Sequence, residues 1–279
     1  MKGNMNMKKN SIILIIAFLI IILLSWIAYD KGYIFKKEDN NIKENTPQEK
    51  EITDEDLIKT LNEKLDYLSN LDTDEVKSQP SIFNQNTQNS DLTDEQKITS
   101  ILYTLVQEES NFEEYSNEEY NEVFPEITAS GLTKEDFPKI SANIVLEKVE
   151  EIYGEKPTNT KIDTVSCPTY NYNEKYNAFY IGSQCGGLYS NIARIYPYKY
   201  TQKEDSLYIY VSVGLIEFNS NLNEFIFYTN YDKKTEYQKS SSLNDLQITS
   251  ANYQEFTKYK IKFIKKDNNY IFDSTENIK

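Results

Sequence analysis

KYKIKFIKKDNNYIFDS, residues 258–274, is the stretch of sequence that indicates the fold most clearly. From Lys258 to Phe263 lysines alternate with aromatic and aliphatic residues, which is the period of a strand with one buried face. The polar segment Lys266–Asn269 joins this strand to a second one, Tyr270–Ser274. The stretch therefore predicts an antiparallel hairpin whose buried face carries Tyr259, Ile261 and Phe263.

The same character extends back to Pro157, with aromatic and β-branched runs separated by turn residues. We therefore expect residues 155–279 to form a twisted antiparallel β-rich domain. The candidate strands before the hairpin are Lys161–Cys167, Ala178–Ile181, Ile192–Tyr198, Leu207–Val213 and Glu224–Asn230.

Residues 53–154 have helical rather than strand periodicity. Apolar residues recur at helical spacing from Thr53 to about Asn70, and Thr93 with Gln96 forms a capping box ahead of a second apolar stripe. A third helix is predicted over Ser141–Tyr153, ended by Gly154. This part reads as a helical segment with disordered loops, and the sequence leaves the order of residues 77–122 open. The predicted fold class is α+β.

The N-terminus contains an uncharged run of twenty residues, Asn10–Tyr29. A helix of this length spans about 30 Å, the thickness of a bilayer's hydrocarbon core. We expect a retained single-pass signal anchor, because a cleaved signal peptide would be shorter and would place Trp26 at the −3 position. Cleavage is the alternative. The predicted parts are a tail and transmembrane helix over residues 1–35 and a polar, flexible tether over residues 36–52.

Lysines flank the predicted span on both sides, so lysine counting does not decide its orientation. The two cysteines favour an extracytoplasmic C-terminal part, because a pair outside the membrane suggests a disulfide between Cys167 and Cys185. Free thiols are the alternative. Two cysteines without histidine cannot supply the four ligands of a zinc site.

Charge and composition limit the functions of the chain. The first 37 residues hold six lysines and one acid, whereas residues 38–279 carry a net charge of −19. Such an acidic domain repels phosphate backbones, so we expect no nucleic-acid partner. The absence of histidine excludes the usual serine and cysteine hydrolase arrangements. No phosphate-binding glycine loop and no EF-hand spacing occur, so we expect no cofactor, no metal site and no catalytic residues.

Two kinds of residue remain as candidates for function. Tyrosine occurs 23 times, and exposed rings can form a recognition surface; the first candidates are Tyr196, Tyr198 and Tyr200. The segment Ile101–Phe112 superficially resembles lytic transglycosylases, which implies Glu109 as a general acid of a cell-wall enzyme. The later Gly-Leu-Met-Gln-type stretch of that family is missing, and the neighbouring residues are highly charged.

The order of the parts resembles uncharacterised membrane-anchored proteins of low-GC Gram-positive bacteria. The resemblance rests on the segment Val149–Gly154, on Cys167 with Cys185-Gly-Gly187, and on Tyr259–Phe263, and it implies no activity. The closing hairpin is also similar to the end of the NTF2-like fold, a curved sheet with packed helices. We therefore expect a non-enzymatic binding or interaction module held in the bilayer by residues 10–29, with a cell-wall or envelope-protein partner. The alternatives are a carboxylate-dependent cell-wall enzyme and an NTF2-like small-ligand domain.

Overall fold

A computed structural model describes residues 48–69, 82–83, 86–125, 132–162, 169–182 and 191–278. Of these, residues 49–278 belong to one unit of the chain. The predicted span over residues 10–29 and both cysteines lie outside the described residues. In the described ranges, no helix is both long and apolar enough to cross a membrane.

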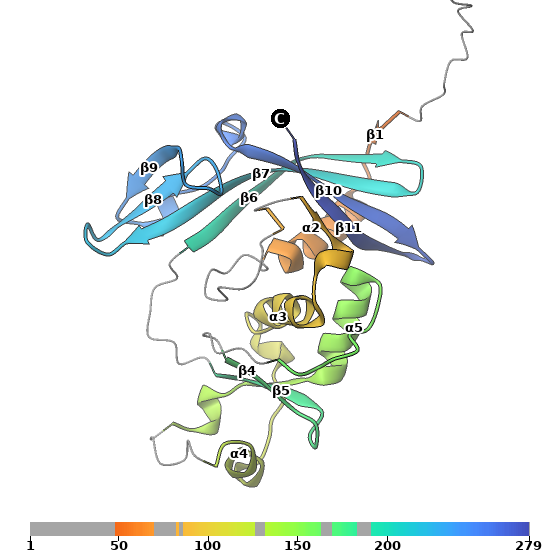
Figure 1. Ribbon diagram of the computed structural model, residues 1–279, viewed down its shortest axis with the longest axis vertical. Helices are drawn as coiled ribbons and strands as arrows, with labels where there is room; N and C mark the ends of the chain where they lie inside the picture. The colour runs from red at the N-terminus through yellow and green to blue at the C-terminus, as the bar shows by residue number, and fades with distance from the viewer. Residues whose placement is uncertain are drawn as a thin grey trace, which may run out of the picture. The chain divides into compact units, whose positions relative to one another are not determined.

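A large antiparallel sheet of eight strands dominates this unit (Figure 1). Its main path runs β1-β6-β7-β10-β11-β2, while β8 pairs with the far part of β7 and β9 pairs with β8. The predicted closing hairpin is confirmed as β10 and β11. The strands are β1 (Lys50–Glu51), β2 (Thr87–Gln88), β6 (Asn191–Lys203), β7 (Ser206–Asn219), β8 (Glu224–Tyr228), β9 (Glu236–Ser240), β10 (Thr257–Lys266) and β11 (Asn269–Ile278).

A second, three-stranded sheet has the order β3-β5-β4 and is also antiparallel. Helices α2, α3 and α5 lie between the two sheets, and α4 lies beyond the small one (Figure 1). The strands are β3 (Lys139–Ser141), β4 (Thr169–Asn173) and β5 (Ala178–Gly182); the helices are α2 (Glu55–Ser69), α3 (Asp94–Leu105), α4 (Asn117–Val123) and α5 (Ala142–Tyr153). Short 3₁₀ turns are η2 (Asn89–Asp91), η3 (Glu109–Asn111), η4 (Lys134–Asp136), η5 (Leu243–Asp245) and η6 (Tyr253–Glu255).

One hydrophobic core joins the helices to both sheets. The side of the large sheet that faces the helices, here called its inner face, contributes Ile209 and Val211 of β7 and Ile261 of β10. The helix-rich and strand-rich parts of the sequence therefore share a core. The opposite, outer face carries a separate cluster at the β8–β9 end, formed by Ile216, Phe227, Leu246, Ile248 and Phe256.

Local sequence signals place the helix ends as predicted. The Thr93 hydroxyl accepts from the Gln96 amide at 3.2 Å, and the Gln96 side chain accepts from the Thr93 amide at 2.8 Å, so the capping box is formed. Gly154 ends α5 with φ +85°, a left-handed conformation that suits glycine.

The α+β class and the large antiparallel sheet are confirmed, with differences in detail. Lys161 and Ile162 are not in a strand, and the rest of that candidate lies outside the described residues. Strands β1, β2, β3, β4 and β9 were not predicted, and β1 lies within the segment predicted as a flexible tether. Strand β9 is almost wholly exposed, so it has no alternation to detect. Within the acidic segment whose order the sequence left open, Ser116 caps α4 by accepting from the Glu119 amide at 3.1 Å.

Candidate interaction surface

A β-bulge in β6 decides which of the predicted tyrosines lie together. Pro197 pairs with Val211 and Lys199 pairs with Tyr210, so Tyr198 is an extra residue that has no pairing partner in β7. Tyr196 and Tyr198 consequently lie on the outer face. Tyr200 is turned to the inner face, where it packs against the main core and its hydroxyl donates to Asn62 of α2 at 2.7 Å. The structure brings two of the three candidates together and separates the third.

Two further tyrosines complete the group on the outer face. The Tyr198 ring centroid lies 5.0 Å from that of Tyr253 in η6 and 6.2 Å from that of Tyr210 in β7. The ring centroid of Tyr196 lies 5.7 Å from that of Tyr253. We call Tyr196, Tyr198, Tyr210 and Tyr253 the tyrosine cluster. All four rings are half-buried, so each presents part of its surface to solvent.

The tyrosine cluster rests on a rigid support. The hydroxyl of Ser212, beneath it in β7, is buried and donates to the Tyr253 carbonyl at 2.9 Å, which ties η6 down onto the sheet. Burial raises the pKa of Tyr198, and the neighbouring hydroxyls of Tyr210 and Tyr253 act in the same direction. The ring of Tyr198 therefore stays neutral over the physiological range.

Lysines border the cluster on the outer face. The ammonium of Lys199, an exposed residue, lies 5.0 Å from the Tyr210 centroid, and that of Lys260 lies 4.0 Å from the Tyr208 centroid. These distances are within the range of cation–π attraction. The surface thus combines amphipathic rings with the exposed ammonium of Lys199, whereas the charge of Lys260 is paired with Glu49.

Glu49, just before β1, is bound at the same surface. Its carboxylate accepts hydrogen bonds from Tyr210 at 2.5 Å, Thr201 at 2.9 Å and Lys260 at 2.5 Å. Burial acts to raise the pKa of Glu49, but these three donors and the Lys260 charge outweigh it and lower the pKa to about 2. The chain therefore enters its folded part next to the tyrosine cluster.

The remaining sequence candidates do not join this surface. Glu109 lies exposed at the start of η3, on the small-sheet side of the helices. Cys167 and Cys185 are outside the described residues, so their pairing stays a prediction. Among the residues that the structure describes, no group of three or more acidic, cysteine or histidine side chains is arranged to hold a metal ion.

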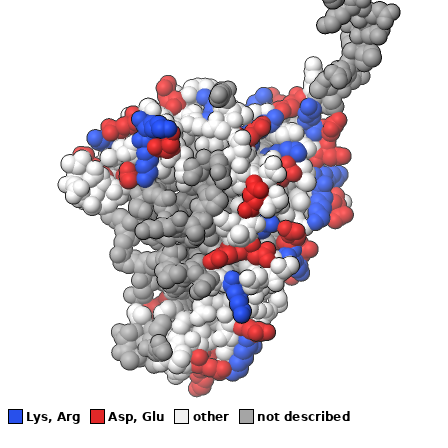
Figure 2. Space-filling view, viewed as in Figure 1, with Lys and Arg blue, Asp and Glu red and all other residues white. Residues whose placement is uncertain are grey.

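The distribution of charge does not by itself mark a site. Acidic and basic side chains are intermixed over the face seen in Figure 2 rather than gathered into one field of a single sign. The tyrosine cluster is the more specific feature, because it depends on a bulge, a buried hydroxyl and residues from three separate segments.

Comparison with known proteins leaves the chain without a family assignment. No protein-family model matches the sequence, and neither a curated protein nor a solved structure matches the chain. Any functional conclusion therefore rests on the residues and their geometry.

Proposed function

We propose that the chain is a single-pass, membrane-anchored module that presents its α+β domain outside the membrane for non-enzymatic binding of a cell-envelope component. The observation that carries this proposal is the tyrosine cluster. Half-buried tyrosines offer rigid, amphipathic contact area at little cost in conformational entropy, which is why they are frequent in binding hot spots. Within the described ranges, the hydroxyls of Tyr196, Tyr198 and Tyr253 donate no hydrogen bond, so they are available to a partner.

The predicted anchor and tether would hold the tyrosine cluster close to the membrane. The chain leaves the predicted span at Tyr29 and reaches the sheet at Glu49, a separation of about 19 residues. We propose that this stretch serves as the tether that the sequence predicts, which would keep the domain near the bilayer and leave it free to contact the envelope.

The two alternatives receive less support from the geometry. An NTF2-like binding domain needs an apolar cavity between sheet and helices, whereas Leu61 and Leu68 of α2 are fully buried in the core on the inner face. A cell-wall enzyme needs a carboxyl group in an apolar enclosure, whereas Glu109 is exposed. Loss of peptidoglycan turnover in a Glu109→Gln variant of an otherwise active preparation would favour the enzyme.

The full chain in lipid nanodiscs, incubated with purified cell-wall sacculi and separately with detergent-extracted envelope proteins, tests the proposal. We expect specific capture in one of the two experiments. Tyr198→Ala should reduce it at least about tenfold, because a hot-spot ring contributes about 2 kcal/mol. Tyr172→Ala is a matched control, since the half-buried ring of Tyr172 also packs against another ring, that of Phe179, but in the small sheet. No capture, or equal losses in both variants, would argue against the proposal.

The membrane part of the proposal has its own test. Alkaline washing of membranes should leave the full chain in the pellet, and an impermeant thiol reagent should label the cysteines in intact cells only after an impermeant reductant has cleaved the disulfide. Release of the intact chain by alkali, or reduced thiols facing the cytoplasm, would contradict the anchor and the topology.

A further inference from the structure

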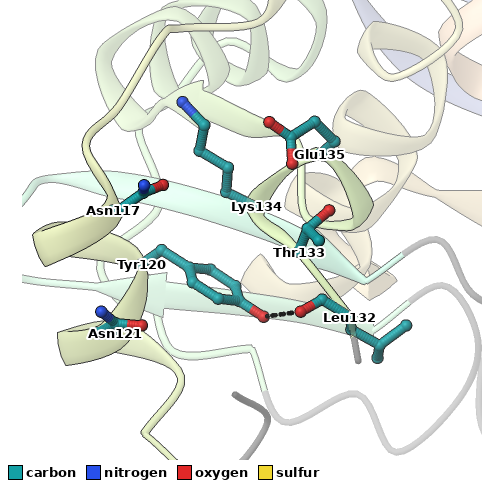
Figure 3. A pocket seen from close by; sticks show the side chains of 7 residues that line it. All are labelled: Asn117, Tyr120, Asn121, Leu132, Thr133, Lys134 and Glu135. Atoms are coloured by element: carbon teal, nitrogen blue, oxygen red, sulfur yellow. Dashed lines mark hydrogen bonds between the residues drawn. The ribbon is translucent and has the colours of Figure 1, made fainter. Parts of the chain in front are cut away.

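A second feature lies beside the small sheet, around α4 and the turns η3 and η4. Two open hollows occur there, and they share Lys134 and Glu135 of η4. The first, of about 600 Å³, lies between α4 and residues 132–135 (Figure 3). The second, of about 400 Å³, we call the mixed-charge hollow. It is lined by Glu109, Phe112, Glu113, Glu114, Tyr115, Lys134, Glu135, Pro138 and Lys139.

Lys139 gives the mixed-charge hollow a buried positive charge. This β3 residue is only 9% exposed, and its ammonium lies 2.8 Å from the Glu119 carboxylate. The Tyr180 hydroxyl donates to the same Glu119 carboxylate, which fixes that partner in place. A buried ammonium requires close counter-charges, and Glu119 supplies the first of them.

The second counter-charge of Lys139 is held loosely. Glu113 approaches the Lys139 ammonium at 3.7 Å, beyond hydrogen-bonding distance, and its side chain is 43% exposed. The backbone of Glu113 is nevertheless fixed, because its amide donates to the Lys139 carbonyl at 2.8 Å. Glu113 is thus the weaker of the two carboxylate partners of Lys139 and the one that an incoming acceptor could replace, and its exposed side chain can move aside while its backbone bond to β3 is kept.

The rest of the lining has the opposite charge and an apolar part. Glu109, Glu114 and Glu135 are exposed carboxylates, whereas Phe112, Tyr115 and Pro138 provide apolar surface. Lys134 keeps its positive charge, but its ammonium is held at the Tyr115 carbonyl at 3.1 Å, and the charge acts on the neighbouring Glu135 carboxylate. A simple anion would be repelled by the three carboxylates, and a simple cation would leave the ammonium of Lys139 without a better partner.

We propose that the mixed-charge hollow binds a small zwitterion, a free amino acid or short peptide with both termini charged. Its carboxylate replaces Glu113 at the Lys139 ammonium, and its ammonium group lies among Glu109, Glu114 and Glu135. The hollow is of a size typical for small ligands. This site is separate from the tyrosine cluster and does not depend on the envelope partner proposed above.

Calorimetric titration of the detergent-solubilised full chain with glycylglycine tests the site. Acetylglycylglycine, which lacks the ammonium, and glycylglycinamide, which lacks the carboxylate, are the matched probes. We expect saturable binding of glycylglycine and at least about tenfold weaker binding of each capped probe, because each lost charge-assisted contact costs about 1.5 kcal/mol or more. No saturable binding of glycylglycine, or equal affinities for all three probes, would overturn the proposal.

Two variants distinguish ligand binding from general electrostatics. Glu113→Gln should strengthen glycylglycine binding severalfold, because it removes the carboxylate that competes for Lys139. Glu109→Gln should weaken binding severalfold, while Glu118→Gln, an exposed acid of α4 outside the hollow, should leave it unchanged. Weaker binding in Glu113→Gln, or an equal effect of Glu109→Gln and Glu118→Gln, would also contradict the site. Replacing Lys139 itself would be less informative, since it breaks the buried pair with Glu119.

Discussion

Glu49 and Lys260 stand 211 positions apart in the sequence, and their side chains form an ion pair of 2.5 Å on the outer face of the large sheet. The pair joins the first described residues to the hairpin that closes the sheet. Because Thr201 and Tyr210 donate to the same carboxylate, Glu49 connects three strands although it lies within the predicted tether of residues 36–52.

This relationship predicts a pH-dependent contribution to stability. The pKa of Glu49 is lowered from 4.5 to about 2 in the folded chain, so its contribution is complete above pH 4.5 and is lost as the pH falls toward 2. Allowing for solvent screening, Glu49→Gln should lower the free energy of unfolding by about 1–2 kcal/mol at pH 7 and by clearly less at pH 3. Denaturant unfolding at both pH values measures this. Glu51→Gln, an exposed neighbour in β1, should have little effect; a loss that does not change with pH would contradict the assignment.

The bulge at Tyr198 leads to a second prediction. Tyr200→Phe removes the hydroxyl that donates to Asn62 and should cost about 1 kcal/mol, because the amide oxygen of Asn62 loses its donor at the interface between β6 and α2. Tyr198→Phe should be neutral in stability, since its hydroxyl makes no hydrogen bond within the described residues. Chemical denaturation of the two variants side by side provides the measurement. Equal losses would mean that the two tyrosines do not lie on opposite faces.

These two tyrosines also show how far the sequence could be interpreted. The closing hairpin was predictable because its lysines alternate with core residues without interruption from Lys258 to Phe263. In β6 one inserted residue reverses the faces after Pro197, and periodicity alone does not reveal a single insertion. Proline in a strand is a hint of such a bulge, but it does not give its position.

Only some of the residues that accompany Tyr196 and Tyr198 on the outer face could be predicted from the sequence. Tyr208 and Tyr210 alternate with buried Leu207 and Ile209, so their common face could have been predicted from β7 alone. Tyr253 could not, because it reaches the surface through a turn that is fixed by the distant Ser212. The mixed-charge hollow likewise depends on β3, a three-residue strand with no periodic signal, pairing with β5.

Lys64 of α2 provides a third prediction. Its ammonium is buried and donates to the Glu151 carbonyl at 3.1 Å, and burial lowers the pKa of Lys64. Keeping this group charged is therefore costly, so Lys64→Met should be neutral or stabilising by about 1–3 kcal/mol at pH 7. Since the folded pKa lies below the unfolded value of 10.5, that advantage should shrink as the pH rises toward 10.5. Unfolding curves at pH 7 and 10 measure it, and a large destabilisation at pH 7 would contradict the argument.

The fourth prediction concerns Gly154, where α5 ends against β11. A Cβ at this position would collide with Cδ1 of Ile271, and the φ of +85° is unfavourable for any residue with a side chain. Gly154→Ala should therefore lower the free energy of unfolding by about 2–3 kcal/mol, of which roughly 1 kcal/mol comes from the backbone conformation.

A double-mutant cycle separates the two causes at Gly154. Ile271→Val removes the Cδ1 atom that the new Cβ would meet, so in that background Gly154→Ala should cost only about 1–2 kcal/mol. The remaining cost reflects the left-handed backbone, and Gly154→Asn should reduce it further because asparagine tolerates that conformation better than alanine. Guanidinium unfolding of the four proteins in the cycle gives the coupling energy. If Gly154→Ala cost the same with Ile271 and with Val at that position, the close approach of α5 to β11 would not be the source of the destabilisation.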